Sequence, residues 1–434
     1  MTLNIKHTNK HWSFFKTDHE AAYKQPPLDQ EHVKYAMATL RRPTSGEWFA
    51  LPPRSLLFGA EAAVIHYNCF SRIVAVLVNR IFGIPLVAYF DDLGDPAPTD
   101  LAQPALGAVK IFLPTLGISL NARKTGMGEL TTFLGIEWKF PNPSNGMTLA
   151  LALPLGKKTR WTDAINKIIK LGVVTHDQLE SLAGRLSFSQ TSVFGRFGRP
   201  MLTPLYNKLN TTTSHPLLTE KETMVLQWWA TALHNMDRRA VRDNADRPDV
   251  VVFTDSATST AIIAAVAIGR ADFLVNETAQ EARKTVTGKY WEALFDSTNL
   301  IYGLEMLALL AILYYPNNRL RNKNATFHID NANAFDAVVK NSARPSVIVA
   351  MTHLIWHRIY ELGITAWFEW VPGNRNIADL PTRNVTIPFK CVEGKTFPDL
   401  RKLHGVIRDA KQALETGRPI IVPRILERTP AGHV

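Results

Sequence analysis

The chain has 434 residues, of which 46% are hydrophobic and 20% charged, a composition that excludes wholesale disorder. Lys and Arg outnumber Asp and Glu by 49 to 38, and the formal net charge of +11 favours a polyanionic partner such as nucleic acid. The two cysteines, Cys69 and Cys391, exclude a disulfide framework and a zinc site built on several cysteines, and they fit a reducing compartment.

The N-terminal segment has no apolar core of the kind that a secretory signal needs. The most apolar stretch, residues 73–90, contains Arg80 and Pro85. It falls short of the clean span of about 20 apolar residues that a membrane helix requires. We therefore expect a protein without a membrane partner, in the cytoplasm or nucleus.

Three changes in composition divide the chain. Residues 1–140 mix short β-rich runs with apolar helical runs and end at a Pro- and Asn-rich break, 141–146. Residues 151–243 are predicted to be helical and basic, with 13 Lys and Arg against 7 Asp and Glu. The polar run 238–249 predicts a linker. The chain is therefore expected to hold more than one domain.

The part after this linker alternates between strand and helix patterns. Strands are predicted at 250–254, 261–268, 325–329 and 364–371, and helices at 304–315 and 346–362. This alternation predicts a mixed α/β (α+β) domain with one sheet. The last fifty residues are basic and give no clear fold signal.

A pair of carboxylates stands out in the N-terminal third. Tyr89-Phe90-Asp91-Asp92 follows the apolar run 84–88, so a strand entering a tight turn would present both acids at its tip. Adjacent carboxylates repel each other unless a cation lies between them, and Mg²⁺ takes such oxygen ligands together with substrate phosphates. Taken alone, the string is equally compatible with a solvated turn.

Four further segments accompany this pair, in an order and spacing that resemble the palm motifs of reverse transcriptases. They surround Asp18, Gly59 and Lys124 and end at residues 133–136. The resemblance implies that Asp18 and Asp91 bind two Mg²⁺ or Mn²⁺ ions, with a less direct role for Asp92. It also implies that Tyr23 selects the nucleotide and that Gly59 lets the template and nucleotide approach the backbone. Lys124 would donate a proton to the leaving pyrophosphate.

The chain also departs from that family, and two of these departures bear on its activity. Only 17 residues precede Asp18, so most of the fingers subdomain is expected to be missing from this chain. Asp95-Pro96 follows closely after Asp92, which predicts a short second strand in the carboxylate hairpin. A nuclease with an inactive palm is therefore an alternative function.

The C-terminal third contains four acids that could converge, at the ends of predicted strands, in a helix and in a turn. Asp255 ends a strand, Glu305 lies in an apolar helix, Asp330 follows a strand, and Asp379 lies in a polar turn. Four carboxylates that converge at neutral pH need cations, and two metal ions could activate a water and stabilise the leaving oxygen of a phosphodiester. Taken singly, each acid is more often a cap or a surface charge. An aspartic-protease motif is disfavoured because Ala257 occupies its glycine position.

The ordered set of acids resembles the ribonuclease H domain of retroelement reverse transcriptases. The string 376–383 is similar to the closing motif of long-terminal-repeat and tyrosine-recombinase-type elements. This resemblance implies that Asp255, Glu305, Asp330 and Asp379 bind two Mg²⁺ or Mn²⁺ ions. His353 and His357 could replace the loop histidine of some members, but we favour a structural helix for them.

The basic middle region occupies the position of a thumb and connection. Six of its cations could contact phosphates, although a solvated helix face would have the same composition. They are Lys157, Lys158, Arg160, Arg185, Arg196 and Arg199. Trp228 and Trp229 are predicted to lie in a core.

Together these features predict a retroelement Pol fragment. Its domains would be a palm at 1–145, a helical thumb/connection at 146–245, a ribonuclease H-like domain at 246–385 and a basic tail at 386–434 of unknown fold. The expected partners are an RNA template, a DNA primer, dNTP and an RNA–DNA hybrid. Besides the nuclease, the other alternative is a decayed or domesticated element that only binds nucleic acid.

Overall fold

The computed structural model describes most of the chain. The described residues are 10–140, 149–190, 198–211, 216–235, 239–240, 248–269, 279–286, 288–295, 300–314, 320–341, 343–387, 391–393, 400–416, 418 and 420. They divide into two compact units, with the division between Ala152 and Leu153.

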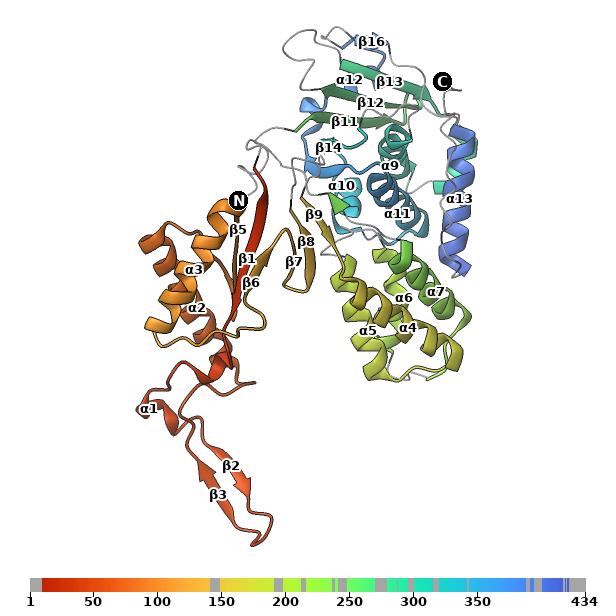
Figure 1. The fold of residues 1–434 in the computed structure, drawn as a ribbon. Coiled ribbons are helices and arrows are strands. Elements are labelled where there is room, and N and C mark those ends of the chain that lie inside the picture. Colours follow the sequence, from red (N-terminus) through yellow and green to blue (C-terminus); the bar gives the residue numbers. More distant parts are fainter. Residues whose placement is uncertain are drawn as a thin grey trace, which may run out of the picture. The chain divides into compact units, whose positions relative to one another are not determined.

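Unit 1 is built around a four-stranded antiparallel sheet in the order β4-β5-β1-β6. These strands are β1 (Trp12–Asp18), β4 (Val87–Tyr89), β5 (Asp92–Pro98) and β6 (Gly126–Gly128). Two long helices, α2 (Glu61–Phe82) and α3 (Thr99–Thr115), lie along one side of the sheet (Figure 1). Phe15, Leu93 and Val109 form the core between sheet and helices, because alternate residues of a strand face the same side.

Strand β5 is longer than the sequence predicts. It runs for 7 residues, through Asp95 and Pro96, where a short strand was expected. The pairing of β5 with β4 extends only as far as Gly94, which pairs with Val87. After Gly94, the side of β5 that faces β4 is therefore an open edge. A proline on an open edge removes no ladder hydrogen bond, which explains why the strand continues.

The remaining elements of unit 1 are short. They are η1 (Ala22–Lys24), α1 (Gln30–Val33), β2 (Ala38–Arg41), β3 (Trp48–Leu51), β7 (Leu130–Phe133), β8 (Ile136–Lys139) and β9 (Ala150–Ala152). Strands β2 and β3 pair with each other in a hairpin whose residues are all exposed. Strands β7, β8 and β9 form an antiparallel meander.

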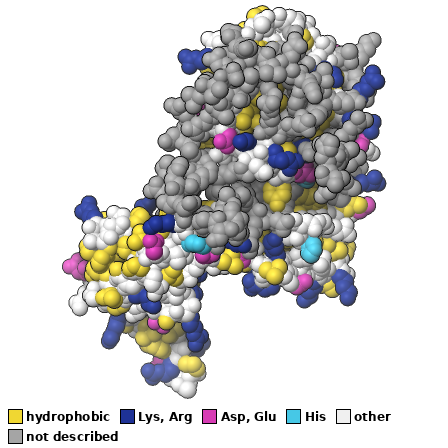
Figure 2. Space-filling model, turned by 45° about the horizontal axis from the view of Figure 1, so that its top comes forward, with side chains coloured by type: hydrophobic (Ala, Val, Ile, Leu, Met, Phe, Trp, Pro, Cys, Tyr) yellow, Lys and Arg dark blue, Asp and Glu magenta, His cyan; other side chains and the backbone are white. Residues whose placement is uncertain are grey.

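Helix α2 is, among the described helices, the one long and apolar enough to cross a membrane by length and composition. Its Val74 and Val78 are nevertheless buried in the core of unit 1, and Ile65 and Ile73 are exposed. Exposed apolar side chains of unit 1 are visible in yellow in Figure 2. A single helix of this kind is weak evidence for a membrane span, because core helices of globular proteins can have the same length and composition.

The first half of unit 2 is helical, as predicted for the basic region. Its elements are α4 (Leu155–Leu171), α5 (His176–Ser189), η4 (Arg199–Met201), α6 (Thr203–Asn210), α7 (Glu220–Asn235) and β10 (Arg239–Ala240). Thr175 and Gln178 begin α5 with a reciprocal capping box. Trp229 is completely buried and donates its indole N–H to the carbonyl of Met201, so its prediction as a core residue is confirmed.

The second half of unit 2 contains a six-stranded mixed sheet in the order β15-β14-β11-β12-β13-β16. Its strands are β11 (Val250–Ala257), β12 (Ile262–Gly269), β13 (Ala279–Thr285), β14 (Asn324–Ile329), β15 (Thr365–Trp370) and β16 (Cys391–Glu393). Strand β11 is antiparallel to β12 and parallel to β14. The mixed α/β class predicted from the sequence is confirmed.

Helices α9, α10 and α11 lie together beside this sheet, and α13 lies along α11 (Figure 1). The helices are α8 (Gly288–Phe295), α9 (Leu300–Leu313), α10 (Ala332–Lys340), α11 (Ser346–Glu361), η7 (Gly373–Arg375), α12 (Asp379–Thr382) and α13 (Leu400–Thr416). Helix α13 lies in the tail for which no fold was predicted from the sequence. Leu400, Leu403 and Ile407 are buried at helical spacing, a signal that the sequence already contained.

Close packing between α8 and α9 leads to a first prediction. A Cβ atom at Gly303 would overlap the buried ring of Phe295. Gly303→Ala should therefore lower the free energy of unfolding by roughly 1–3 kcal/mol, the usual cost of overpacking. Gly405→Ala in α13 is the matched control: nothing lies within 4 Å of the added atom. The free energy of unfolding of Gly405→Ala, measured by urea denaturation, should rise by up to about 1 kcal/mol. An unchanged stability of Gly303→Ala would contradict the packing.

Candidate metal centre and carboxylate hairpin

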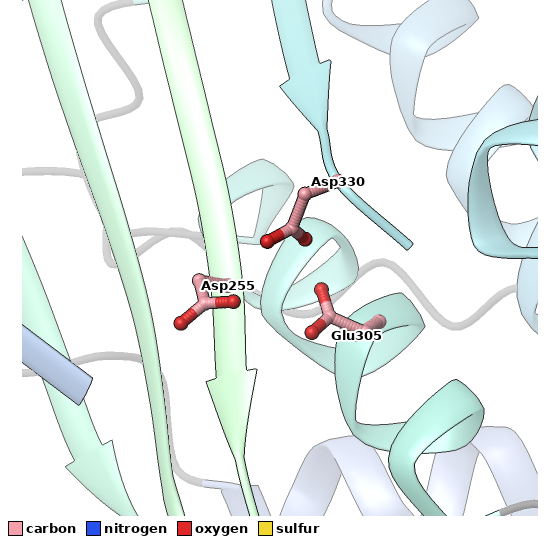
Figure 3. A group of neighbouring side chains, drawn as sticks. All are labelled: Asp255, Glu305 and Asp330. Atoms are coloured by element: carbon pink, nitrogen blue, oxygen red, sulfur yellow. The ribbon is translucent and has the colours of Figure 1, made fainter. Parts of the chain in front are cut away.

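Three of the predicted acids of unit 2 converge on one point. Asp255 lies on β11, Glu305 on α9, and Asp330 directly after β14, and their carboxylates point toward one another (Figure 3). The parallel register pairs Thr254 with Ile329, so the acids that follow these residues lie at neighbouring positions. One ligand atom from each carboxylate lies within 4.8 Å of the others.

The three carboxylates are partly or fully withdrawn from water, and this destabilises their charged forms. Burial is the main cause that raises the pKa of Asp255 to about 6, and it also raises the pKa of Asp330. The pKa of Glu305 is raised well above its ordinary value by burial and then by the charges of Asp255 and Asp330. A bound cation would offset both the burial and the mutual repulsion.

The hydrogen bonds around Glu305 leave one of its oxygens available. The backbone N–H and the hydroxyl of Ser256 donate to Glu305 Oε1, at 3.0 and 2.9 Å. Glu305 Oε2 is buried and has no hydrogen-bond partner among the described residues. Buried oxygen atoms normally have a partner, and hard oxygen donors are the ligands of Mg²⁺ and Mn²⁺. The three acids therefore fit a divalent cation.

Polar side chains that were not predicted as site residues hold these acids in place. Thr382 is buried and its hydroxyl lies 2.6 Å from Asp255 Oδ2, to which it donates. The Asn376 amide donates to the carbonyl of Thr254 at 2.9 Å, and a hydrogen bond from the same side chain lowers the pKa of Asp330 against the effect of burial. Asn376 and Thr382 both lie in the string that resembles the ribonuclease H closing motif, and this was the signal that could have identified them.

The fourth predicted acid, Asp379, begins α12 and has a different partner. Its Oδ1 lies 2.8 Å from Nε of Arg383, in an ion pair one helical turn apart. The group of three ligand atoms does not include Asp379. The structure thus brings three of the four predicted acids together and places the fourth beside an arginine.

The acids of unit 1 meet at a strand turn. Asp18 ends β1 and pairs in register with Asp92, which begins β5. Asp91 lies in the turn between β4 and β5, where its carbonyl accepts a hydrogen bond from the backbone N–H of His19. Phe90 has a positive φ of 51° in this turn, and the hydroxyl of Ser71 on α2 donates to its carbonyl. Helix α2 therefore helps to fix the turn that presents the acids.

Lys124 reaches into this carboxylate group. Its Nζ lies 2.8 Å from Asp18 Oδ2, and this hydrogen bond raises the pKa of Lys124. Burial raises the pKa of Asp92, followed by the charges of Asp91 and Asp18. Over the described parts of the chain, Asp18, Asp91 and Asp92 do not form a second group of ligand atoms as close as that in unit 2. In this arrangement a lysine ammonium is the cation nearest to Asp18.

The two residues predicted to contact the nucleotide and template are Tyr23 and Gly59. The half-buried Tyr23 ring lies with its centroid 4.9 Å from that of Tyr67 on α2. Gly59 has a φ of 93°, a backbone conformation that L side chains rarely adopt. Tyr67 is fully buried and its hydroxyl lies 2.6 Å from His19 Nδ1, so a residue next to Asp18 positions the ring that supports Tyr23.

A second prediction concerns this buried pair. Tyr67→Phe keeps the ring and removes only the hydroxyl, so His19 Nδ1 would lose its partner. The free energy of unfolding should fall by about 1–3 kcal/mol, the cost of a buried polar group without a hydrogen bond. Tyr89→Phe is the control, because that tyrosine is exposed and should tolerate the change. Urea denaturation of both variants measures the difference, and equal stabilities would contradict a role for the His19–Tyr67 contact.

The predicted phosphate-contacting residues lie on the helices of unit 2. Lys157, Lys158 and Arg160 are on α4, Arg185 is on α5, and Arg199 is at η4, whereas Arg196 lies outside the described residues. Lys157 Nζ lies 5.1 Å from the centroid of the Phe188 ring, and burial lowers its pKa. Arg160, Arg185 and Arg199 are exposed. Figure 2 shows Lys and Arg side chains at many points of the visible described surface.

The two histidines with alternative interpretations both lie on α11. His353 is 1% exposed, packs at 6.0 Å from the Trp228 ring, and burial lowers its pKa to about 3. His357 forms an ion-pair contact with Glu361 on the same helix at 3.6 Å. These contacts agree with the preferred interpretation of a structural helix.

Comparisons with protein-family models and with curated proteins gave no match to this sequence. Two of the solved structures that it resembles contain a foamy viral protease-reverse transcriptase. The structure with an RNA/DNA hybrid covers 92% of this chain at 15% sequence identity and a TM-score of 0.44. The structure with dsDNA covers 82% of this chain at 16% identity and a TM-score of 0.42. The chain spans 48% of the first protein's length and 67% of the second's.

Proposed function

We propose that unit 2 contains a metal-dependent nuclease site of ribonuclease H type that cleaves the RNA strand of RNA–DNA hybrids. The observation that carries this proposal is the convergence of Asp255, Glu305 and Asp330 within 4.8 Å, together with the unpartnered Oε2 of Glu305. The motif order in the sequence supports the choice of a hybrid as the substrate.

The residues of this site would have distinct tasks. Asp255, Glu305 and Asp330 would hold Mg²⁺ or Mn²⁺, and two such ions would stabilise the attacking and leaving oxygens of the phosphodiester. Ser256 orients Glu305 through Oε1, which leaves the buried Oε2 without a hydrogen-bond partner among the described residues. Thr382 and Asn376 fix Asp255 and Asp330 by hydrogen bonds. Because these supports are buried, the carboxylates are held in place before substrate binds.

Cleavage of a labelled hybrid tests this proposal. RNA labelled at its 5′ end and annealed to DNA should be cut in Mg²⁺ or Mn²⁺, and EDTA should stop the reaction. The same RNA as a single strand or paired with RNA is the matched control for contaminating ribonucleases. Cleavage that persists in EDTA, or that is equal on all three substrates, would contradict a ribonuclease H-type site.

We further propose RNA-directed DNA synthesis by unit 1 as a second function, in a retroelement protein of the long-terminal-repeat or tyrosine-recombinase type. The pairing of Asp18 with Asp92 beside Asp91 and the contact of Lys124 with Asp18 favour it. Asp18 and Asp91 would hold two Mg²⁺ or Mn²⁺ ions, and Lys124 would protonate the leaving pyrophosphate. Tyr23 and Gly59 would contact the dNTP and the template, and the basic helices of unit 2 would bind phosphates of the primer–template duplex.

Primer extension tests this second function separately. A labelled DNA primer on an RNA template should be extended in the presence of dNTPs and Mg²⁺ or Mn²⁺, and the Asp91→Asn variant should extend nothing. Hybrid cleavage without extension would indicate a nuclease only. Salt-sensitive binding of the hybrid without cleavage or extension would indicate a protein that only binds nucleic acid.

A further inference from the structure

Arg383 forms an ion pair with Asp379 beside the proposed nuclease site. Its Nε lies 2.8 Å from Asp379 Oδ1, and the hydrogen bond and charge of Asp379 raise the pKa of Arg383, with a smaller contribution from the charge of Asp255. The side chains of Arg383 and Asp379 are 68% and 28% exposed, respectively. The guanidinium of Arg383 therefore pairs with Asp379, the predicted acid that lies outside the group of Asp255, Glu305 and Asp330.

The backbone that carries this ion pair is tied to the site. The hydroxyl of Thr382 donates to Asp255, and the carbonyl of Thr382 accepts a hydrogen bond from the Thr260 hydroxyl at 2.7 Å. Helix α12 also packs on β11. Since Thr382 is completely buried, Asp379 and Arg383 are held next to Asp255 by their own backbone. What can change is the direction of the two side chains, the largely exposed Arg383 and the half-buried Asp379.

We propose that Arg383 acts as an internal counter-cation that competes with a metal ion for Asp379. This inference rests on the proposed nuclease function. A first divalent cation would bind Asp255, Glu305 and Asp330 without disturbing the ion pair. A second would take Asp379 as a ligand only when Arg383 leaves it. The strength of the ion pair would then set the metal concentration at which the site is completely filled.

The energetics allow a competition of this kind. An ion pair whose arginine is largely exposed contributes little free energy, because water screens it and both side chains must be ordered. A divalent ion between several carboxylates gains more from the same carboxylate oxygen, so it can displace the guanidinium at moderate concentration. Arg383 is therefore a positioning residue that adjusts metal affinity without blocking the site.

Direct binding of Mn²⁺ to the full chain tests the proposal without any turnover. Electron paramagnetic resonance of free Mn²⁺ gives the isotherm, in an Asp91→Asn background that limits binding in unit 1. Arg383→Gln should tighten the weaker class of bound Mn²⁺ roughly fivefold, the factor that the loss of such an ion pair permits. The stronger class should stay the same. Asp379→Asn should remove the weaker class, and adding Arg383→Gln to it should have no further effect.

Arg375→Gln is the matched control, because Arg375 is a nearby exposed arginine on η7. An equal tightening in this variant would show a general effect of net charge and overturn the proposal, as would an unchanged weaker class in Arg383→Gln. Glu305→Gln distinguishes a failure of the competition from a failure of the proposed nuclease site. A stronger class that depends on Glu305, with no response to Arg383, would leave the nuclease site intact and refute only the competition. Absence of any Glu305-dependent binding would refute both.

Discussion

Glu305→Gln should abolish RNA cleavage in the hybrid and at the same time stabilise the metal-free protein. Glu305 is 4% exposed, and the charges of Asp255 and Asp330 act with burial to raise its pKa. The amide would remove a metal ligand, and the loss of several kcal/mol of transition-state stabilisation corresponds to a rate decrease of about 1000-fold or more. Without metal, the amide removes the cost of ionising a buried carboxyl beside two others, so the free energy of unfolding should rise, and the gain should grow with pH.

Cleavage rates in Mg²⁺ and urea denaturation in EDTA measure these two effects on the same variant. Gln can still accept the hydrogen bonds that Ser256 donates to Oε1, so the change is confined to charge and ligand strength. Glu369→Gln is the control, since Glu369 is an exposed acid of β15 in the same sheet. Cleavage by Glu305→Gln at the wild-type rate would remove Glu305 from the metal centre, and lost cleavage with lower stability would indicate misfolding.

Asp95→Asn should stabilise the protein strongly at alkaline pH and hardly at all in acid. Asp95 is 4% exposed, and strand alternation places it on the same face of β5 as the core residue Leu93. Burial raises its pKa from 3.8 to about 7. A shift of roughly 3 pKa units corresponds to about 4 kcal/mol between the protonated and the charged side chain.

The pH range follows from the direction of this shift. Below about pH 4 the carboxyl is protonated in both the folded and the unfolded chain, so it contributes no pH dependence. Between that pH and about 7 the folded chain binds more protons, so stability falls as pH rises. Above about 7 the loss is complete. Asp95→Asn should therefore gain up to about 4 kcal/mol at pH 8 and little at pH 4.

Urea denaturation of wild type and variant at both pH values checks this result. Asp100→Asn is the control, because Asp100 is exposed and Lys10 lowers its pKa. That variant should show no gain at pH 8. An equal effect of Asp95→Asn at both pH values would mean that Asp95 is not buried as a carboxylic acid.

Local patterns in the sequence were sufficient for most elements around the site. The strand predicted at 325–329 and the amphipathic helix predicted at 346–362 correspond to β14 and α11 within one residue at each end. Such patterns depend on neighbouring residues alone. The helix α13 was missed although its apolar spacing was present, because the surrounding prolines and charges obscured it. The predicted length of β5 was wrong because the length depends on how far the pairing with the neighbouring strand β4 extends.

The sequence by itself determined the mixed α/β class, the order of the acids and the residue types that suit a divalent metal. Only the tertiary structure decided which acids meet. The register of β11 with β14 brings Asp255 beside Asp330, and packing of α9 adds Glu305. Asp379 forms an ion pair with Arg383, and Asp18 forms one with Lys124. These choices depend on side-chain directions and on distant segments that pack together, which a linear pattern of residues does not specify.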